Sequence, residues 1–183
     1  MDYGPWTTYI GTMEKNPELE VWQRGPIDGV PALLQPVAHA LLQAVEDVEK
    51  EMSAFPSELL WEKPGGVASI GFHLKHVRGV VDRLFTYARG EMLSDVQSKD
   101  LKEETVAGAM DSIQILMNNF KTQVTTAIDQ LKTIETNTLT EKRGVGRKQI
   151  PSTVIGLLFH AAEHIQRHVG QLIVTARVLK ERS

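Results

Sequence analysis

Residues 154–179 read VIGLLFHAAEHIQRHVGQLIVTARVL, and their apolar residues recur every three or four positions. This spacing places the apolar side chains along one side of an α-helix, in a stripe suited to burial against other helices. Three earlier segments share the pattern, at about residues 31–52, 69–89 and 105–134. Almost no strand pattern competes with these four segments. The sequence therefore predicts an all-α fold, a four-helix bundle.

Local signals mark where the helices begin and end. Pro31 suits a first helical position, Ser69 suits an N-cap, and Gly90 is expected to stop the second helix. Pro151 should open the fourth helix. The polar segment 91–104 is long enough to run the length of a bundle. We therefore expect a long crossover between helices 2 and 3 that sets these two helices parallel.

The length of 183 residues predicts a single domain, residues 1–183. Residues 1–29 are irregular and rich in Gly and Pro, but they carry four aromatic side chains: Tyr3, Trp6, Tyr9 and Trp22. Aromatic residues at this density seldom belong to a loose tail. We expect this N-terminal arm to pack on the bundle.

The composition excludes several kinds of site and partner. The chain has no Cys, which rules out disulfides, thiolate nucleophiles, iron–sulfur clusters and Cys-ligated zinc. A net charge of −3 offers no broad positive surface for nucleic acid or for an anionic membrane. No signal-like start or membrane-spanning apolar run is found, so we expect a cytoplasmic protein. Any metal ion must be held by His, Asp or Glu.

Five of the six histidines lie in two short windows, on the second and fourth predicted helices. Two His four residues apart can bind one ion, and a third from a facing helix leaves a position open, as in catalytic sites. Measured from the centre of the apolar stripe, His168 lies about 40° away, His164 about 80° and His160 about 120°. On the second helix His73 lies about 50° away and His76 about 110°. Periodicity alone therefore favours His73 over His76, and leaves His160 with either a supporting role or none.

A second pattern overlaps the first. Residues 160–164 read HAAEH, which is the H-x-x-E-H pattern of inverted zincins, in which the Glu acts as general base. Glu163, however, falls about 180° from the buried stripe. We expect it to face solvent, which disfavours peptidase chemistry. No residue is assigned as a catalytic base, because nothing singles out Asp82 or Glu46 among the remaining acids.

The string HIQRHVGQ at residues 164–171 resembles the end of the metal-binding helix in the DinB/YfiT-like superfamily. That family has the pattern H-x3-H-x-G-Q, matched here by His164, His168, Gly170 and Gln171. WEKPGG at residues 61–66 resembles the W-x-x-P-G-G approach to the second helix in many members. The likeness extends over nearly the whole chain, with four helices and a long middle crossover.

The resemblance also implies which residues bind metal. The family's remaining ligand lies seven residues after the Ser or Thr that opens the second helix, which gives His76 when counted from Ser69. A divalent ion (Zn, Ni, Fe or Mn) is then held by His76, His164 and His168. This choice differs from that of the helical angles, which favour His73 over His76. The candidates for orienting these ligands or for contacting substrate are His73, His160 and Gln171.

Superfamily members of known activity resemble thiol-dependent transferases or isomerases that use low-molecular-weight thiols such as bacillithiol or mycothiol. The resemblance therefore implies a metal-dependent transferase that joins a thiol cosubstrate to a small electrophilic substrate. Two alternatives stay open: a metal-dependent hydrolase, and a non-enzymatic metal-binding helical-bundle stress protein. Neither nucleic acid nor membrane is an expected partner, and a homodimer is compatible with the family.

Overall fold

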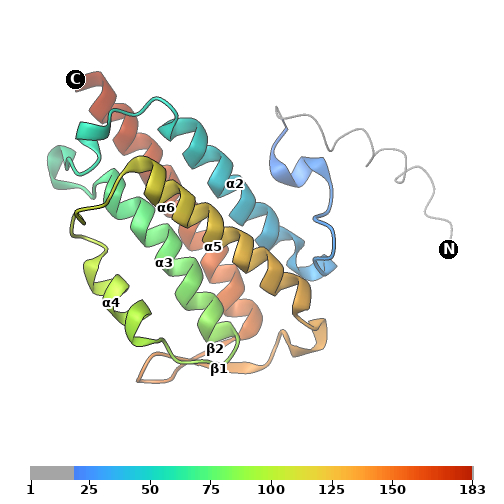
Figure 1. The fold of residues 1–183 in the computed structure, drawn as a ribbon. Helices are drawn as coiled ribbons and strands as arrows, with labels where there is room; N and C mark the ends of the chain where they lie inside the picture. Colours follow the sequence, from blue (N-terminus) through green and yellow to red (C-terminus); the bar gives the residue numbers. More distant parts are fainter. Residues whose placement is uncertain (1–18, 183) are drawn as a thin grey trace.

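The computed structural model describes residues 19–182, and within them four long helices pack into a bundle (Figure 1). The predicted all-α class is confirmed. The four helices of the bundle are α2 (Gln35–Met52), α3 (Ile70–Ala88), α5 (Ile113–Thr133) and α6 (Val154–Arg182). The remaining elements are α4 (Asp95–Glu103), the strands β1 (Lys142–Val145) and β2 (Ile150–Thr153), and the 3₁₀ turns η1 (Val21–Arg24), η2 (Ala32–Leu34), η3 (Ser57–Leu59), η4 (Pro64–Gly66) and η5 (Thr136–Thr138).

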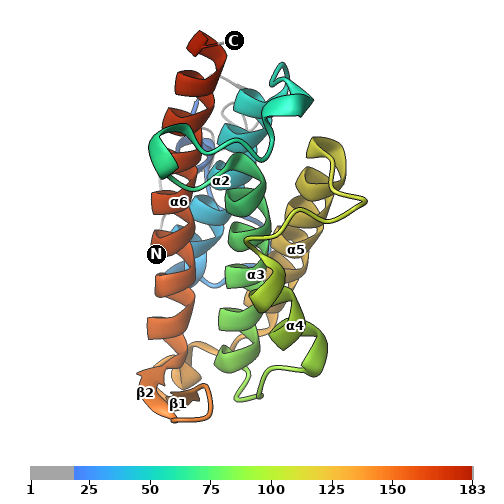
Figure 2. The same cartoon turned by 90° about the vertical axis from the view of Figure 1, so that its left-hand side faces the viewer.

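The long helices run in two opposite directions. In both views α2 and α6 run one way, whereas α3 and α5 run the other way (Figures 1 and 2). The connection from α3 to α5 therefore returns along the bundle, which is the predicted crossover. It is not a plain loop, because it carries α4, which starts with a capping box between Ser94 and Gln97. None of the residues of α4 is buried, so no apolar stripe marked it in the sequence.

The expected start of the third helix, at about residue 105, is wrong. α5 begins at Ile113, and the Ser112 side chain caps it by accepting a hydrogen bond from the backbone N–H of Ile115 at 3.2 Å. Val106 and Met110 continue the apolar spacing but are 58% and 78% exposed. Apolar residues in a turn can extend a helical pattern, and the cap then decides where the helix begins.

The start of the last helix also differs from the expectation. Residues 150–153, which include Pro151, form β2 and pair antiparallel with β1, so α6 starts at Val154. The turn of this hairpin has positive φ at Gly146 (65°) and at Gln149 (49°). The Nε of Arg143 donates to the carbonyl of Ala88 at 2.8 Å, which ties the hairpin to the end of α3.

The core fills the space between the four long helices. The predicted centre of the stripe on α6 is buried, with Val154 at 2% exposure and Ile165 and Leu172 at 0%. The largest fully buried aromatic side chains are Phe85 of α3 and Phe120 of α5. Among the described helices, none has an apolar stretch long enough to cross a bilayer.

The described part of the N-terminal arm packs on α2 through Val21. This side chain is buried, and its backbone N–H donates to Oε1 of Gln43 at 2.8 Å. Arg24 forms an ion pair with Glu46 of α2 at 2.6 Å. Trp22 is 61% exposed and lines a hollow together with Pro36 and His39 of α2. Tyr3, Trp6 and Tyr9 lie outside the described residues.

Candidate metal site

Neighbouring faces of α3 and α6 bring together histidines from both sequence windows. One ring nitrogen from each of His76, His164 and His168 lies within 4.8 Å of the other two. The Nε2 atoms of His76 and His164 are 3.0 Å apart. The structure thus gathers the three residues that the resemblance implies as ligands. His73 lies behind them, in contact with His168.

The N-terminal end of α3 fixes the direction of its histidines. The Ser69 side chain accepts from the backbone N–H of Phe72 at 3.2 Å, as an N-cap does. The Phe72 ring stacks on that of His76, with ring centroids 5.1 Å apart and an angle of 17° between the planes. Gly71 leaves room for Trp61, since a Cβ at this position would lie 2.6 Å from the indole ring.

A buried carboxylate holds His76. Its Nδ1 lies 2.7 Å from Oε2 of Glu104, and the other oxygen of Glu104 accepts from Arg83 at 2.6 Å. Because the carboxylate accepts, Nδ1 of His76 carries a proton and Nε2 presents its lone pair toward His164. A carboxylate behind a histidine is a common support for metal ligands. Sequence reasoning missed Glu104, because it lies at the end of the polar crossover.

One pattern in the sequence is compatible with a polar partner on this face of α3, although it does not identify Glu104. His76, Gly79 and Arg83 follow the i, i+3, i+7 spacing of a single helix face. A Cβ on Gly79 would lie 2.5 Å from Oε1 of Glu104 and would also collide with the Arg83 guanidinium. The glycine therefore makes room for the Arg83–Glu104 pair against α3.

His168 is supported by another histidine. The Nδ1 atoms of His73 and His168 are 3.1 Å apart, so one of them donates a proton to the other. Burial, with the neighbouring His76 second, lowers the pKa of His73 to about 4. Burial, followed by His76 and His164, also lowers the pKa of His168 to about 4. Both rings are neutral near pH 7, as metal coordination by imidazole requires.

His164 has a different neighbour. Its Nδ1 is 3.0 Å from a guanidinium nitrogen of Arg167, which can only donate. Nδ1 is therefore the accepting nitrogen in this arrangement, and the proton lies on Nε2. Coordination through Nε2 requires Arg167 to release Nδ1, and Arg167 has a second partner in Glu163 at 2.8 Å. Burial first, then the charges of His76 and His160, lowers the pKa of His164.

The remaining candidates lie at the edge of the cluster. His160 is exposed, and its Nδ1 is 2.6 Å from Oε1 of Glu163. His160, Glu163 and His164 form a second group of possible ligands, with one atom from each within 4.8 Å of the others. Glu163 is shared with Arg167, however, which occupies its carboxylate. Gln171 is exposed, and within residues 19–182 no hydrogen bond joins it to the cluster.

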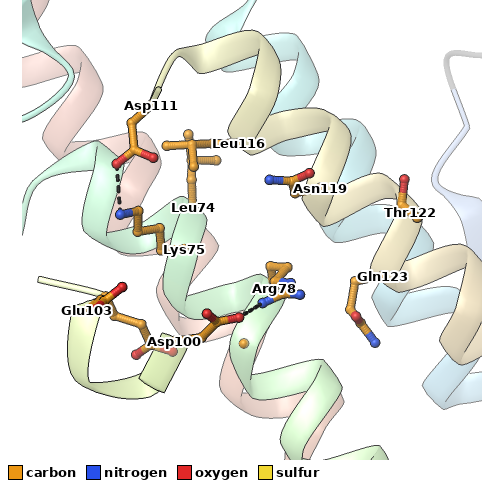
Figure 3. Close-up of a pocket in the computed structure, with 12 residues that line it drawn as sticks. Leu74, Lys75, Arg78, Asp100, Glu103, Asp111, Leu116, Asn119, Thr122 and Gln123 are labelled. Atoms are coloured by element: carbon orange, nitrogen blue, oxygen red, sulfur yellow. Dashed lines mark hydrogen bonds and ion pairs between the residues drawn. The ribbon is translucent and has the colours of Figure 1, made fainter. Parts of the chain in front are cut away.

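A polar cavity of about 360 Å³ lies on a different side of α3, between α3, α4 and α5 (Figure 3). Its cations already have partners, because Lys75 pairs with Asp111 at 2.8 Å and Arg78 with Asp100 at 2.7 Å. No imidazole lines it. Glu104 borders both this cavity and the histidine cluster, and the cluster lies on the α6 side of α3.

The family of the chain follows from a comparison over most of its length. The family model described as the DinB superfamily matches residues 33–172. The chain belongs to the DinB superfamily. The DinB match includes α2, α3, α4 and α5 entirely, together with α6 as far as Leu172, and so contains the whole histidine cluster. A search of curated proteins gives no match.

Proposed function

We propose that this DinB-superfamily protein is a divalent-metal-dependent enzyme whose ion is held by His76, His164 and His168. The observation that supports the proposal best is the convergence of three ring nitrogens within 4.8 Å of one another. Imidazole suits zinc, nickel and iron, and the proposed ion is one of Zn, Ni, Fe or Mn. Three protein ligands leave a coordination position for substrate, which is typical of catalytic sites.

The chain's own residues hold the protons that this site needs. Glu104 keeps the proton of His76 on Nδ1 and leaves Nε2 free to coordinate. His73 contacts Nδ1 of His168 and fixes the direction of that ring. When bound, the ion supplies Lewis acidity, which lowers the pKa of a thiol or water molecule that it contacts.

The proposed reaction is transfer of a low-molecular-weight thiol to a small electrophilic substrate. Membership of the DinB superfamily supports this class, because it is the class that the sequence resemblance implies. The composition supports a diffusible thiol, since the chain has no Cys of its own. With water in place of the thiol, the same residues would perform hydrolysis. Identifying the product of the reaction distinguishes thiol transfer from hydrolysis.

Metal analysis tests the site directly. Protein made without a His-tag or a nickel column should contain one ion per chain, and His164→Ala should lose it. His39→Ala is the matched control, because His39 lies on α2 and contacts the carbonyl of Gly25 at 3.0 Å. Equal metal content in the parent and in His164→Ala, or substoichiometric metal in the parent, would overturn the proposed site.

A second measurement separates an enzyme from a metal-binding protein without activity. The displacement of chloride from 1-chloro-2,4-dinitrobenzene by a small thiol is followed by absorbance, with and without a chelator. We expect the rate to fall to the uncatalysed level after chelation and to return when the ion is restored. A catalysed rate that chelation does not change would reject the metal-dependent mechanism.

A further inference from the structure

An apolar cavity of about 250 Å³ adjoins the histidine cluster. His76 and His164 form one part of its wall, so it reaches two of the three proposed ligands. It is distinct from the polar cavity of Figure 3, which no histidine lines. The rest of its lining comes from α3, α6 and the crossover: Val80, Arg83, Leu84, Tyr87, Leu93, Leu101 and His160.

The cavity is long and narrow. Its α3 lining runs from His76 to Tyr87, which are eleven steps apart and so span about 16 Å of helix at 1.5 Å per residue. A volume of about 250 Å³ spread over this length leaves a narrow cross-section. At the far end the Tyr87 hydroxyl lies close to the hairpin turn, 4.0 Å from where a Cβ on Gly146 would stand.

The lining of the cavity favours an apolar ligand group. Between the histidines and Tyr87 it is built from aliphatic side chains, and its one charged residue is Arg83. Arg83 is 8% exposed and its guanidinium is bound to Glu104 at 2.6 Å. A hydrophilic group placed along this aliphatic stretch would lose water without gaining a partner, whereas an apolar group there gains by burial.

Helix α4 covers the cavity without having a core of its own. None of its residues is buried, and polar contacts attach it to α3: Asp100 to Arg78 at 2.7 Å and Gln97 to Thr86 at 2.8 Å. Leu101 is the α4 residue that lines the cavity, and it is 45% exposed. An apolar group in the cavity would cover this side chain.

We infer that one of the two reactants carries a narrow, unbranched apolar chain that lies in this cavity while its reactive end meets the metal site. The inference rests on the proposed function, because it assumes an ion at His76, His164 and His168. The chain extends from the imidazoles toward Tyr87, between α3 and α4. Length and shape of the apolar substituent are therefore the properties that the site selects.

The probes are simple thiols bound to the cobalt(II)-loaded protein and followed by the thiolate-to-cobalt absorption band. From ethanethiol to n-butanethiol, affinity should rise with each methylene, by at most roughly fourfold, the equivalent of about 0.8 kcal/mol for a fully buried methylene. 2-Mercaptoethanol, which has a hydroxyl where propanethiol has a methyl, should bind more weakly than propanethiol. tert-Butanethiol should bind more weakly than n-butanethiol, because the cavity is narrow.

Variants on α4 locate the effect. Leu101→Asn should remove at least part of the dependence on chain length, whereas Val96→Asn should keep it. Val96 is the matched control, since it is an exposed aliphatic residue of the same helix (67%) and does not line the cavity. Equal affinities across the series, or equal binding of the two butanethiols, would overturn the inference and leave the proposed function intact.

If the proposed metal site is wrong, the cavity is tested without a metal ion. If cobalt does not bind, the metal-free protein is titrated with n-hexanol and followed by methyl NMR. The methyl signals of Leu84 and Leu101 should then shift, and hexane-1,6-diol should shift them less. Unchanged signals at these two residues would overturn the inference independently of the metal.

Discussion

Two Arg–Glu–His arrangements flank the histidine cluster, and they differ in their surroundings. In the inner arrangement Glu104 contacts Arg83 at 2.6 Å and His76 at 2.7 Å. In the outer arrangement Glu163 contacts Arg167 at 2.8 Å and His160 at 2.6 Å. The inner side chains are 6–16% exposed, whereas the outer ones are 34–60% exposed. The chemistry and the distances match, whereas the burial of the side chains differs.

Chain topology differs as well. The outer contacts join residues three and four apart on α6, which a helix brings together without any tertiary structure. The inner contacts join residues 21 and 28 apart, from α3 to the end of the crossover. Breaking a buried pair leaves an uncompensated charge, whereas an exposed pair is screened by water and salt. We therefore expect the inner arrangement to support the site and the outer one to matter little.

The largest effect should come from Glu104→Gln. Removing one partner of a buried ion pair costs about 3–5 kcal/mol of unfolding free energy, because Arg83 stays buried without its anion. The Gln amide has a single oxygen and cannot accept from both Arg83 and Nδ1 of His76, so metal affinity should also fall about 10–100-fold. Urea unfolding and competition with a metal-binding dye measure the two effects.

A double variant separates stability from ligand support. Replacing both charges, as Arg83→Met with Glu104→Leu, should restore much of the unfolding free energy, because no lone buried charge remains. Metal affinity should stay low, since His76 still lacks its acceptor. Recovery of both properties would show that Glu104 acts only through stability.

Next in size is the pH dependence of the metal-free protein. The folded-state pKa of His73 and of His168 is about 4, below the value of 6.5 in an unfolded chain. The unfolded state therefore binds more protons between these values, and stability present above pH 6.5 is lost as the pH falls toward 4. For His73, which is 2% exposed, the loss is up to about 3 kcal/mol.

Urea unfolding at a series of pH values measures this loss. Because the rings of His73 and His168 touch, their two contributions should not add in full. His73→Leu removes one titrating group, so its stability should fall less steeply with acid than that of the parent. A parent whose stability is constant from pH 7 to pH 4.5 would contradict the lowered pKa values.

A smaller effect is expected from Gly79→Ala. Alanine normally stabilises a helix relative to glycine by roughly 0.5–1 kcal/mol. Here the new methyl group would displace the Arg83–Glu104 pair, so we expect a net loss of about 1–3 kcal/mol. Gly170→Ala on α6 is the control, because a Cβ there meets nothing within 4 Å, and it should raise stability. Equal effects at the two positions would argue against a spatial role for Gly79.

Local patterns in the sequence predicted much of the fold. The N-cap Ser69, the parallel course of helices 2 and 3, and the buried stripe through Ile165 all follow from spacing and helix signals. The hairpin of β1 and β2 and the start of α5 were not predicted. A turn with positive φ and a single serine cap override a longer apolar pattern at these places.

The histidine cluster was predictable to a similar degree. The clustering of histidines is visible in the sequence, and the family resemblance selected His76, which the structure places beside His164. The helical angle of His73 correctly predicted its burial, since it is 2% exposed. Glu104 could not be found in this way, because its contacts with His76 and Arg83 depend on the course of the crossover. Long-range polar contacts of this kind have no period in a sequence.

The smallest effect should come from Glu163→Gln, which is the counterpart of Glu104→Gln in the outer arrangement. An exposed ion pair contributes less than about 1 kcal/mol, so the unfolding midpoint in urea should barely change. One contact connects this arrangement to the site, because Arg167 lies 3.0 Å from Nδ1 of His164. Gln keeps one accepting oxygen but no charge, so it holds Arg167 less firmly than Glu163 does. Metal affinity should fall no more than about threefold, since water solvates an exposed arginine. A tenfold loss would mean that Glu163 draws Arg167 away from His164 when the ion binds. Burial would then not be what separates the two arrangements.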